Sequence, residues 1–230
     1  TVLIGILCGA AAWVFVELLQ TIRRAFTRLR ERHALWPPLL PMLGAVVLAL
    51  LLLVLPTDYL GLSLPLMERA LDGQSMPTLG FLWKTLLVAI TLGSGFYGGI
   101  VTPQFVIGAV LGGAFAPALG LAPALGAAVG LVAVVASASN APIAAILMGV
   151  ELFGADSTLY VAGACVAAYL IIGHRSVYPA QQIAFSKSSW IFARADLPVG
   201  QEKVRLSYGL LRWWTRRRRQ LGRRDDERLP

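Results

Sequence analysis

From Thr85 to Val150 the chain contains no Asp, Glu, Lys, Arg or His. A helix on the surface of a water-soluble domain keeps one face polar, so a soluble fold cannot accommodate an uncharged stretch of this length. The whole chain agrees with this, because 57% of its 230 residues are hydrophobic and only 14% are charged, against roughly a quarter charged in an ordinary soluble domain. The sequence therefore predicts an all-α polytopic membrane protein.

The apolar segments are short and are separated by Gly and Pro. We expect helices over residues 2–32, 39–55, 64–71, 81–92, 103–119, 123–135, 142–153 and 159–172. Most of these have fewer than the ~20 residues of a standard spanning helix. Irregular backbone is tolerated at membrane depth only inside protein or beside a cavity, and interrupted helices mark the binding sites of transporters. We therefore expect several helices to be broken or re-entrant.

The net charge of +8 is concentrated in two places. Five arginines lie between residues 23 and 32, and ten basic residues lie between Lys203 and Arg228. Both clusters flank apolar segments, and the positive-inside rule assigns such flanks to the cytoplasm. We therefore expect an integral membrane protein with a cytoplasmic C-terminus. Contact with lipid headgroups is the next interpretation, and a nucleic-acid partner is not expected.

The polar and sulfur-containing residues of the apolar part indicate no enzyme chemistry. Cys8 and Cys165 both lie inside apolar runs, where small packing residues are expected. The uncharged stretch offers Ser, Thr, Asn and Gln104 but no general base. We therefore expect no enzyme, no disulfide, no metal site and no cofactor. Because the chain begins at Thr1 inside an apolar run, we also expect it to be part of something longer.

One loop has the chemistry of an anion site. An anion in a membrane needs positive potential without a strongly binding charge, and the unpaired N–H groups of a helix N-terminus supply it. Residues 98–102, Gly-Gly-Ile-Val-Thr, run into Pro103. Thr102 is a suitable N-cap residue and Pro103 is favoured at the first helical position. Local chemistry leaves open a second interpretation, a structural turn between two membrane helices.

Three motifs resemble those of one transport family. Lys84 followed by residues 91–103, Thr-Leu-Gly-Ser-Gly-Phe-Tyr-Gly-Gly-Ile-Val-Thr-Pro, is similar to the signature of the chloride-channel (CLC) family. Asn-Ala-Pro at 140–142, followed by an apolar run to Glu151, resembles the family's Arg-Ala-Pro helix. Residues 174–178, His-Arg-Ser-Val-Tyr, resemble the segment with the pore tyrosine. The matches occur in the family's order, and the resemblance covers the chain up to about Arg194.

The resemblance implies a homodimer in which each subunit has its own anion pathway, built from two inverted helical halves. This chain resembles the second half only, with residues 1–194 in the membrane part and 195–230 as a basic cytoplasmic tail. The first half, which carries the glutamate that gates the pathway and transfers protons, would be a partner. The resemblance also implies halide transport across a membrane, here the bacterial inner membrane, with a halide, protons and lipid as further partners.

The resemblance also implies which residues form the site: Gly99, Ile100, Val101, Thr102 and Tyr178. The backbone N–H groups of Ile100 and Val101 would face the ion, and the Tyr178 hydroxyl would close its cytoplasmic side. Without the resemblance, the position of Tyr178 beside Pro179 favours an interfacial aromatic residue instead. Glu151, His174 and Arg175 are expected to have structural or interfacial roles.

The chain departs from the usual family motif at two positions of this site. It has Val101 where the family has Phe, and Thr102 where a small residue is usual. This pair resembles the fluoride/proton antiporter branch, and a hydroxyl could replace part of fluoride's tightly held hydration shell. We therefore expect proton-coupled antiport of fluoride, with chloride transport, in which Thr102 is only a cap, as the alternative ion. A passive, voltage-gated-type chloride channel is the alternative mechanism.

Overall fold

The computed structural model describes residues 1–181, 191–192 and 205–206. The chain divides into two units, Thr1–Val177 and Tyr178–Pro230. The expected boundary at residue 194 and nearly all of the basic tail lie outside the described residues, so that division stays a prediction. In the second unit, the described strands β1 (Ile191–Phe192) and β2 (Arg205–Leu206) pair antiparallel, with Ile191 opposite Leu206.

The first unit, all of which is described, is helical and contains no strand. Its α-helices are α1 (Val2–His33), α2 (Leu39–Leu51), α3 (Leu64–Leu71), α4 (Gly80–Gly93), α5 (Val101–Phe115), α6 (Pro123–Ala138), α7 (Pro142–Phe153) and α8 (Thr158–Ile172). Single-turn 3-10 helices occur at η1 (Thr57–Tyr59), η2 (Pro117–Leu119) and η3 (Ala155–Ser157). The predicted all-α fold is confirmed.

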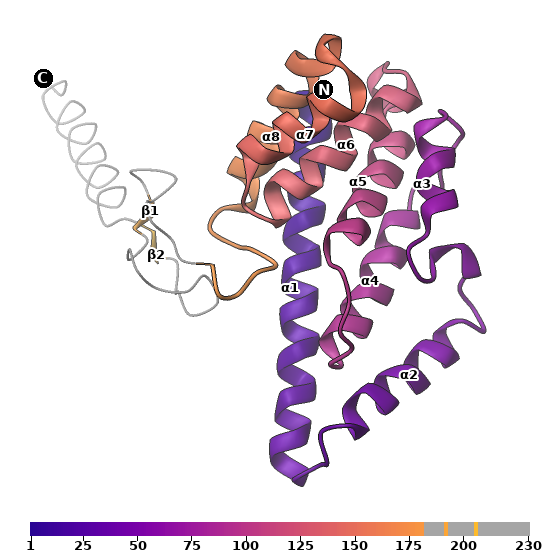
Figure 1. Ribbon diagram of the computed structural model, residues 1–230, viewed down its shortest axis with the longest axis vertical. Coiled ribbons are helices and arrows are strands. Elements are labelled where there is room, and N and C mark those ends of the chain that lie inside the picture. Colours follow the sequence, from indigo (N-terminus) through magenta and orange to yellow (C-terminus); the bar gives the residue numbers. More distant parts are fainter. Residues whose placement is uncertain (182–190, 193–204, 207–230) are drawn as a thin grey trace, which may run out of the picture. The chain divides into compact units, whose positions relative to one another are not determined.

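Helix α6 is the centre of this bundle. It contacts α1, α3, α5, α7 and α8, and it is buried along most of its length. Its residues are only Ala, Val, Leu, Gly, Ser and one Pro, and a helix that is apolar all round must be buried. Figure 1 shows α5 and α4 on one side of it, with α1 passing behind.

Close packing of glycines fixes α5 against α6. A Cβ added at Gly108 would overlap the carbonyl of Gly130, and one added at Gly112 would overlap the carbonyl of Gly126. The two helices therefore run antiparallel at near backbone contact, which small residues at a helix interface allow. This contact puts the first turn of α5 beside the last turn of α6.

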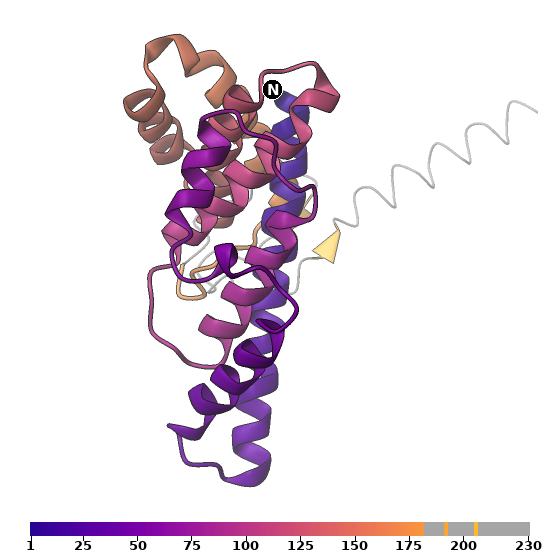
Figure 2. The same ribbon diagram turned by 90° about the vertical axis from the view of Figure 1, so that its right-hand side faces the viewer.

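Helix α1 has a buried half and an exposed half. Ile4, Cys8, Ala12 and Phe15 are completely buried, whereas no residue from Gln20 to His33 is buried. Figures 1 and 2 show this second half extending past the other helices of the bundle, with α2 and the end of α4 beside it. The change in burial coincides with the start of the arginine cluster.

Few of the described helices are long enough to cross a membrane unaided. Two stretches, Val2–His33 and Ala155–Ile172, meet the requirements of length and apolar composition. Helices α4 to α7 have between 12 and 16 residues, which corresponds to at most about 24 Å of rise against a hydrocarbon core of about 30 Å. The expected short helices are therefore present.

Two expected helices end earlier than the sequence indicates. The helix expected to reach residue 119 ends at Phe115, followed by η2. The apolar run suggests a span to Leu55, but α2 ends at Leu51. The N–H groups of Leu53 and Val54 donate to carbonyls three residues back, so the chain tightens into turns. Pro56 follows these turns, and the helix does not resume there because a proline disfavours the α conformation of the residue before it.

Candidate functional site

The turn before α5 leads into a helix start with free backbone donors. Gly95 has a φ of +105°, a conformation that a residue with a side chain rarely adopts. Ile100 is the N-cap of α5, and no side chain caps this end. The first N–H groups of a helix have no partner within it, and among the described residues no turn or loop bond uses the N–H of Ile100 or Val101. This end of α5 therefore presents positive potential.

Thr102 is not the N-cap that the sequence indicates. The helix begins at Val101, so Thr102 and Pro103 lie inside its first turn. A proline is compatible with this position because the N–H groups of the first turn are unpaired in any case. Thr91, in contrast, donates its hydroxyl to the Leu87 carbonyl at 2.7 Å. No hydrogen bond of the Thr102 hydroxyl occurs within the described part of the chain, so this donor is available.

The site is open on one side. A Cβ added at Gly99 would meet no atom of the described residues within 4 Å, and Val101 is 39% exposed. Ile100 and Thr102 are partly buried. The backbone donors at the start of α5 are therefore reached from a face that these helices do not cover.

Gln104 joins the start of α5 to the end of α6. Its side chain is completely buried, and its Nε2 donates to the Ile100 carbonyl at 3.1 Å. The Ser139 hydroxyl donates to Gln104 Oε1 at 2.9 Å. This pair fixes the N-cap of α5 against the neighbouring helix. The sequence does contain a signal for it, since a lone amide side chain in an apolar helix needs a buried partner.

The segment after α8 approaches the end of α6. The Val177 N–H donates to the Ala138 carbonyl at 2.9 Å, which brings the end of the first unit to the last turn of α6. Asn140 has a φ of +56°, and its side-chain Oδ1 is buried without a hydrogen-bond partner among the described residues. Tyr178 begins the second unit, so its position beside Ile100 and Val101 stays a prediction.

Lys84 is a buried cation close to the turn before α5. It is completely buried, and its Nζ donates to the Tyr59 carbonyl at 3.1 Å, the Gly61 carbonyl at 2.7 Å and the Ser63 hydroxyl at 2.8 Å. Within the described chain no carboxylate lies within 4 Å of it. A cavity of about 210 Å³ lies between this loop and the turn, lined by both Lys84 and Gly99. The sequence identifies Lys84 only as part of a motif, and its acceptors are found only in the structure.

The charged residues outside this region form other contacts. Arg175 donates to the Glu17 carboxylate and lies 5.4 Å from the centre of the Trp13 ring. It therefore links α1 to the segment after α8, which is the structural role expected for it. His174 is also buried. Glu151 is exposed in the last turn of α7.

A family model and two known proteins are similar to the chain. The model described as voltage gated chloride channel matches residues 1–173. A "Chloride/fluoride channel protein" of Pseudomonas syringae pv. tomato is 36% identical over 210 residues, which is 88% of this chain and 44% of that protein. An uncharacterized protein of Methanocaldococcus jannaschii is 25% identical over 155 residues, covering 65% of this chain and 37% of that protein.

A solved structure is also similar to the chain. A crystal structure described as a CLC-type fluoride/proton antiporter superposes with a TM-score of 0.72 at 34% sequence identity, covering 77% of this chain and 44% of that chain. The chain thus spans less than half the length of each of these known proteins.

Proposed function

The chain belongs to the voltage-gated chloride channel (CLC) family, and from this we propose that it forms the second half of a transporter that exchanges fluoride for protons. The observation that carries the proposal is the open N-terminus of α5, where the N–H groups of Ile100 and Val101 have no partner among the described residues. An anion there would be stabilised by these donors and by the helix dipole, without a charged side chain that would hold it too tightly.

The choice of fluoride rests on Thr102. Fluoride holds its hydration water tightly, so a site must offer hydrogen-bond donors that replace that water. The Thr102 hydroxyl is one turn or less from the N-cap and is not used by the described residues. The likeness to a structure described as a fluoride/proton antiporter supports the same choice. In the proposed site, Gly99, Ile100, Val101 and Thr102 bind the ion, and the Tyr178 hydroxyl closes the cytoplasmic side.

One feature of the described helices supports a first half. The open face beside Gly99 and Val101 gives the ion no protein contact on that side. We therefore propose that an N-terminal half of the same protein covers this face, that two such proteins form a homodimer in the bacterial inner membrane, and that the C-terminus is cytoplasmic.

A passive chloride channel is the second candidate. It is favoured by the description of the matching family model and by the name of the Pseudomonas relative, both of which contain the word channel. The two candidates differ in whether the movement of the halide is coupled to protons.

Flux measurements distinguish the candidates. The complete protein that contains this chain would be reconstituted in liposomes, with fluoride, chloride and pH followed by electrodes. Fluoride efflux that drives proton uptake, and that falls in Thr102→Val but not in Thr91→Val, supports the antiporter. Halide efflux without proton movement and without dependence on Thr102 contradicts it and supports the channel.

A further inference from the structure

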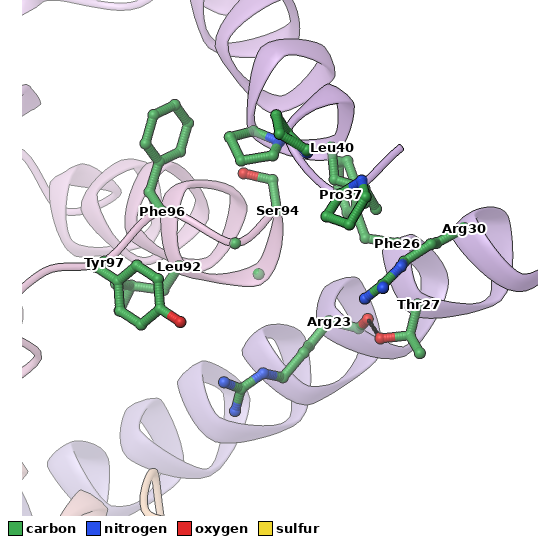
Figure 3. Close-up of a pocket in the computed structure, with 14 residues that line it drawn as sticks. Arg23, Phe26, Thr27, Arg30, Pro37, Leu40, Leu92, Ser94, Phe96 and Tyr97 are labelled. Carbon is green, nitrogen blue, oxygen red and sulfur yellow. Dashed lines mark hydrogen bonds between the residues drawn. The ribbon is translucent and has the colours of Figure 1, made fainter. Parts of the chain in front are cut away.

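A second cavity lies on the basic half of α1. It shares Gly95, Phe96 and Tyr97 with the turn before α5 but is not lined by Gly99. Its volume is about 460 Å³, and it is bounded by α1, the start of α2 and the end of α4 (Figure 3). We call it the basic groove. Its main side chains are Arg23, Phe26, Arg30, Leu40, Phe96 and Tyr97.

Close helix contacts hold the walls of the basic groove together. A Cβ added at Gly93 would lie 2.6 Å from the Ile22 side chain and 3.3 Å from the Arg23 nitrogen, so the end of α4 packs directly on α1. On the other side, a Cβ added at Gly44 would overlap the Ser94 side chain, so α2 packs on the same segment. The end of α4 therefore packs against both α1 and α2, and these three elements form the groove.

The basic groove carries positive charge that the described residues leave unpaired. Arg23 and Arg30 are two helical turns apart and lie on one face of α1. Figure 3 shows both side chains extending into the space between α1 and the segment that carries Tyr97. In the described part of the chain, neither arginine has a carboxylate within 4 Å. No Asp or Glu lines the groove.

Apart from the hydroxyl groups of Thr27, Ser94 and Tyr97, the rest of the lining is largely apolar. Phe26, Leu40 and Phe96 provide ring and aliphatic surface beside the two guanidinium groups. A free halide or phosphate would use the charge but would leave this surface in water. A ligand that uses both has an anionic head and an apolar body.

The position along α1 identifies the source of such a ligand. The apolar part of α1 ends at Leu19, the last buried residue of the helix, and the arginines begin at Arg23. This change marks the boundary between the hydrocarbon core and the headgroups. We propose that the basic groove binds an anionic phospholipid, whose phosphate pairs with Arg23 and Arg30 while its glycerol and upper acyl carbons lie against Phe26 and Leu40.

Lipid binding tests this proposal independently of which ion is transported. The delipidated complete protein would be titrated in detergent with phosphatidylglycerol, or with phosphatidylcholine of the same acyl chains, and the bound lipid measured by native mass spectrometry. We expect Arg23→Gln/Arg30→Gln to weaken phosphatidylglycerol binding roughly 30-fold, with phosphatidylcholine binding nearly unchanged.

The matched control is Arg24→Gln/Arg28→Gln, which removes the same charge from the same helix. Neither of these residues lines the groove, so the expected loss is less than about 3-fold. Equal losses in both pairs would mean that surface charge alone attracts the lipid, and would overturn the proposal. Glycerol phosphate provides the second control. If it competed as strongly as a short-chain phosphatidylglycerol, the groove would be a free-phosphate site and the proposal would be wrong.

Discussion

The Ser139 hydroxyl at the end of α6 donates a 2.9 Å hydrogen bond to the side-chain carbonyl of Gln104 in the first turn of α5. Gln104 also makes a second hydrogen bond, in which its amide nitrogen donates to the Ile100 carbonyl. The N-cap of α5 is therefore held by a neighbouring helix as well as by its own turn. The Gly108–Gly130 and Gly112–Gly126 contacts hold the two helices at the distance that this bond requires.

Replacing Gln104 tests this connection. Gln104→Leu leaves the partly buried Ser139 hydroxyl without its acceptor and releases Ile100, so we expect a loss of about 1–3 kcal/mol in the free energy of unfolding. We also expect weaker halide binding, because the donors at Ile100 and Val101 lose their fixed position. Thermal unfolding in detergent and halide titration measure the two effects. Ser137→Ala is the control, since Ser137 donates only within α6.

Thr102→Val removes a hydroxyl at nearly constant volume. A hydrogen bond to an ion contributes about 1.5–3 kcal/mol, so we expect fluoride transport to fall by tenfold or more. Thr102→Ser should retain most of the activity, because it keeps the donor. Liposome flux with a fluoride electrode measures this. Full fluoride transport in Thr102→Val would show that the hydroxyl is not a ligand of the ion.

Lys84→Met tests the buried cation. The substitution removes the donor of three acceptors on the segment from Tyr59 to Ser63, two of them in buried hydrogen bonds and the Gly61 carbonyl in a partly buried one. We expect a loss of about 3 kcal/mol in the free energy of unfolding. The loop over the cavity beside Gly99 should also become more accessible to hydrogen exchange. Arg69→Gln serves as the comparison, because the Arg69–Asp58 ion pair is about half exposed and its loss should change stability by under about 1 kcal/mol. Equal effects of the two substitutions would contradict a structural role for Lys84.

Gly112→Ala tests the close packing of α5 on α6. The new Cβ would overlap the Gly126 carbonyl, so the helices must separate, and we expect a loss of about 1–3 kcal/mol. Gly163→Ala in α8 is the matched control, because its Cβ would meet only the Val2 side chain at an ordinary 3.6 Å. That variant should be neutral or stabilised by up to about 1 kcal/mol. The melting temperatures of the two variants, compared in detergent, give the result.

Local features of the sequence predict much of the fold. The helix of residues 64–71 is found as expected, and those around 81–92 and 142–153 begin and end within one residue of their predicted limits. The reason is that apolar runs, prolines and glycines act on the residues beside them. The prediction is wrong where an apolar run continues up to a proline. There α2 ends at Leu51, although its apolar run continues to Leu55.

Some features of the candidate site are likewise predicted by the sequence, and others are found only in the structure. The sequence indicates the glycine-rich turn and an anion-binding helix start, because backbone donors and glycines act locally. It does not indicate that α5 begins at Val101. That start places Thr102 inside the first turn and leaves the N-terminus of α5 without a side-chain cap, and it depends on how α5 packs. The expected role of Tyr178 depends on contacts with a distant part of the chain, so it stays a prediction.

The sequence by itself determined that this protein is helical and apolar, which segments form helices, and which turn offers backbone donors. Only the tertiary structure decided which polar groups meet: Gln104 with Ser139, Lys84 with the loop from Tyr59 to Ser63, and Arg175 with Glu17, which are 158 residues apart. The physical reason is that helix formation depends on neighbours along the chain. The pairing of a buried side chain depends on the register and crossing of helices, and that is set by the packing of the whole bundle.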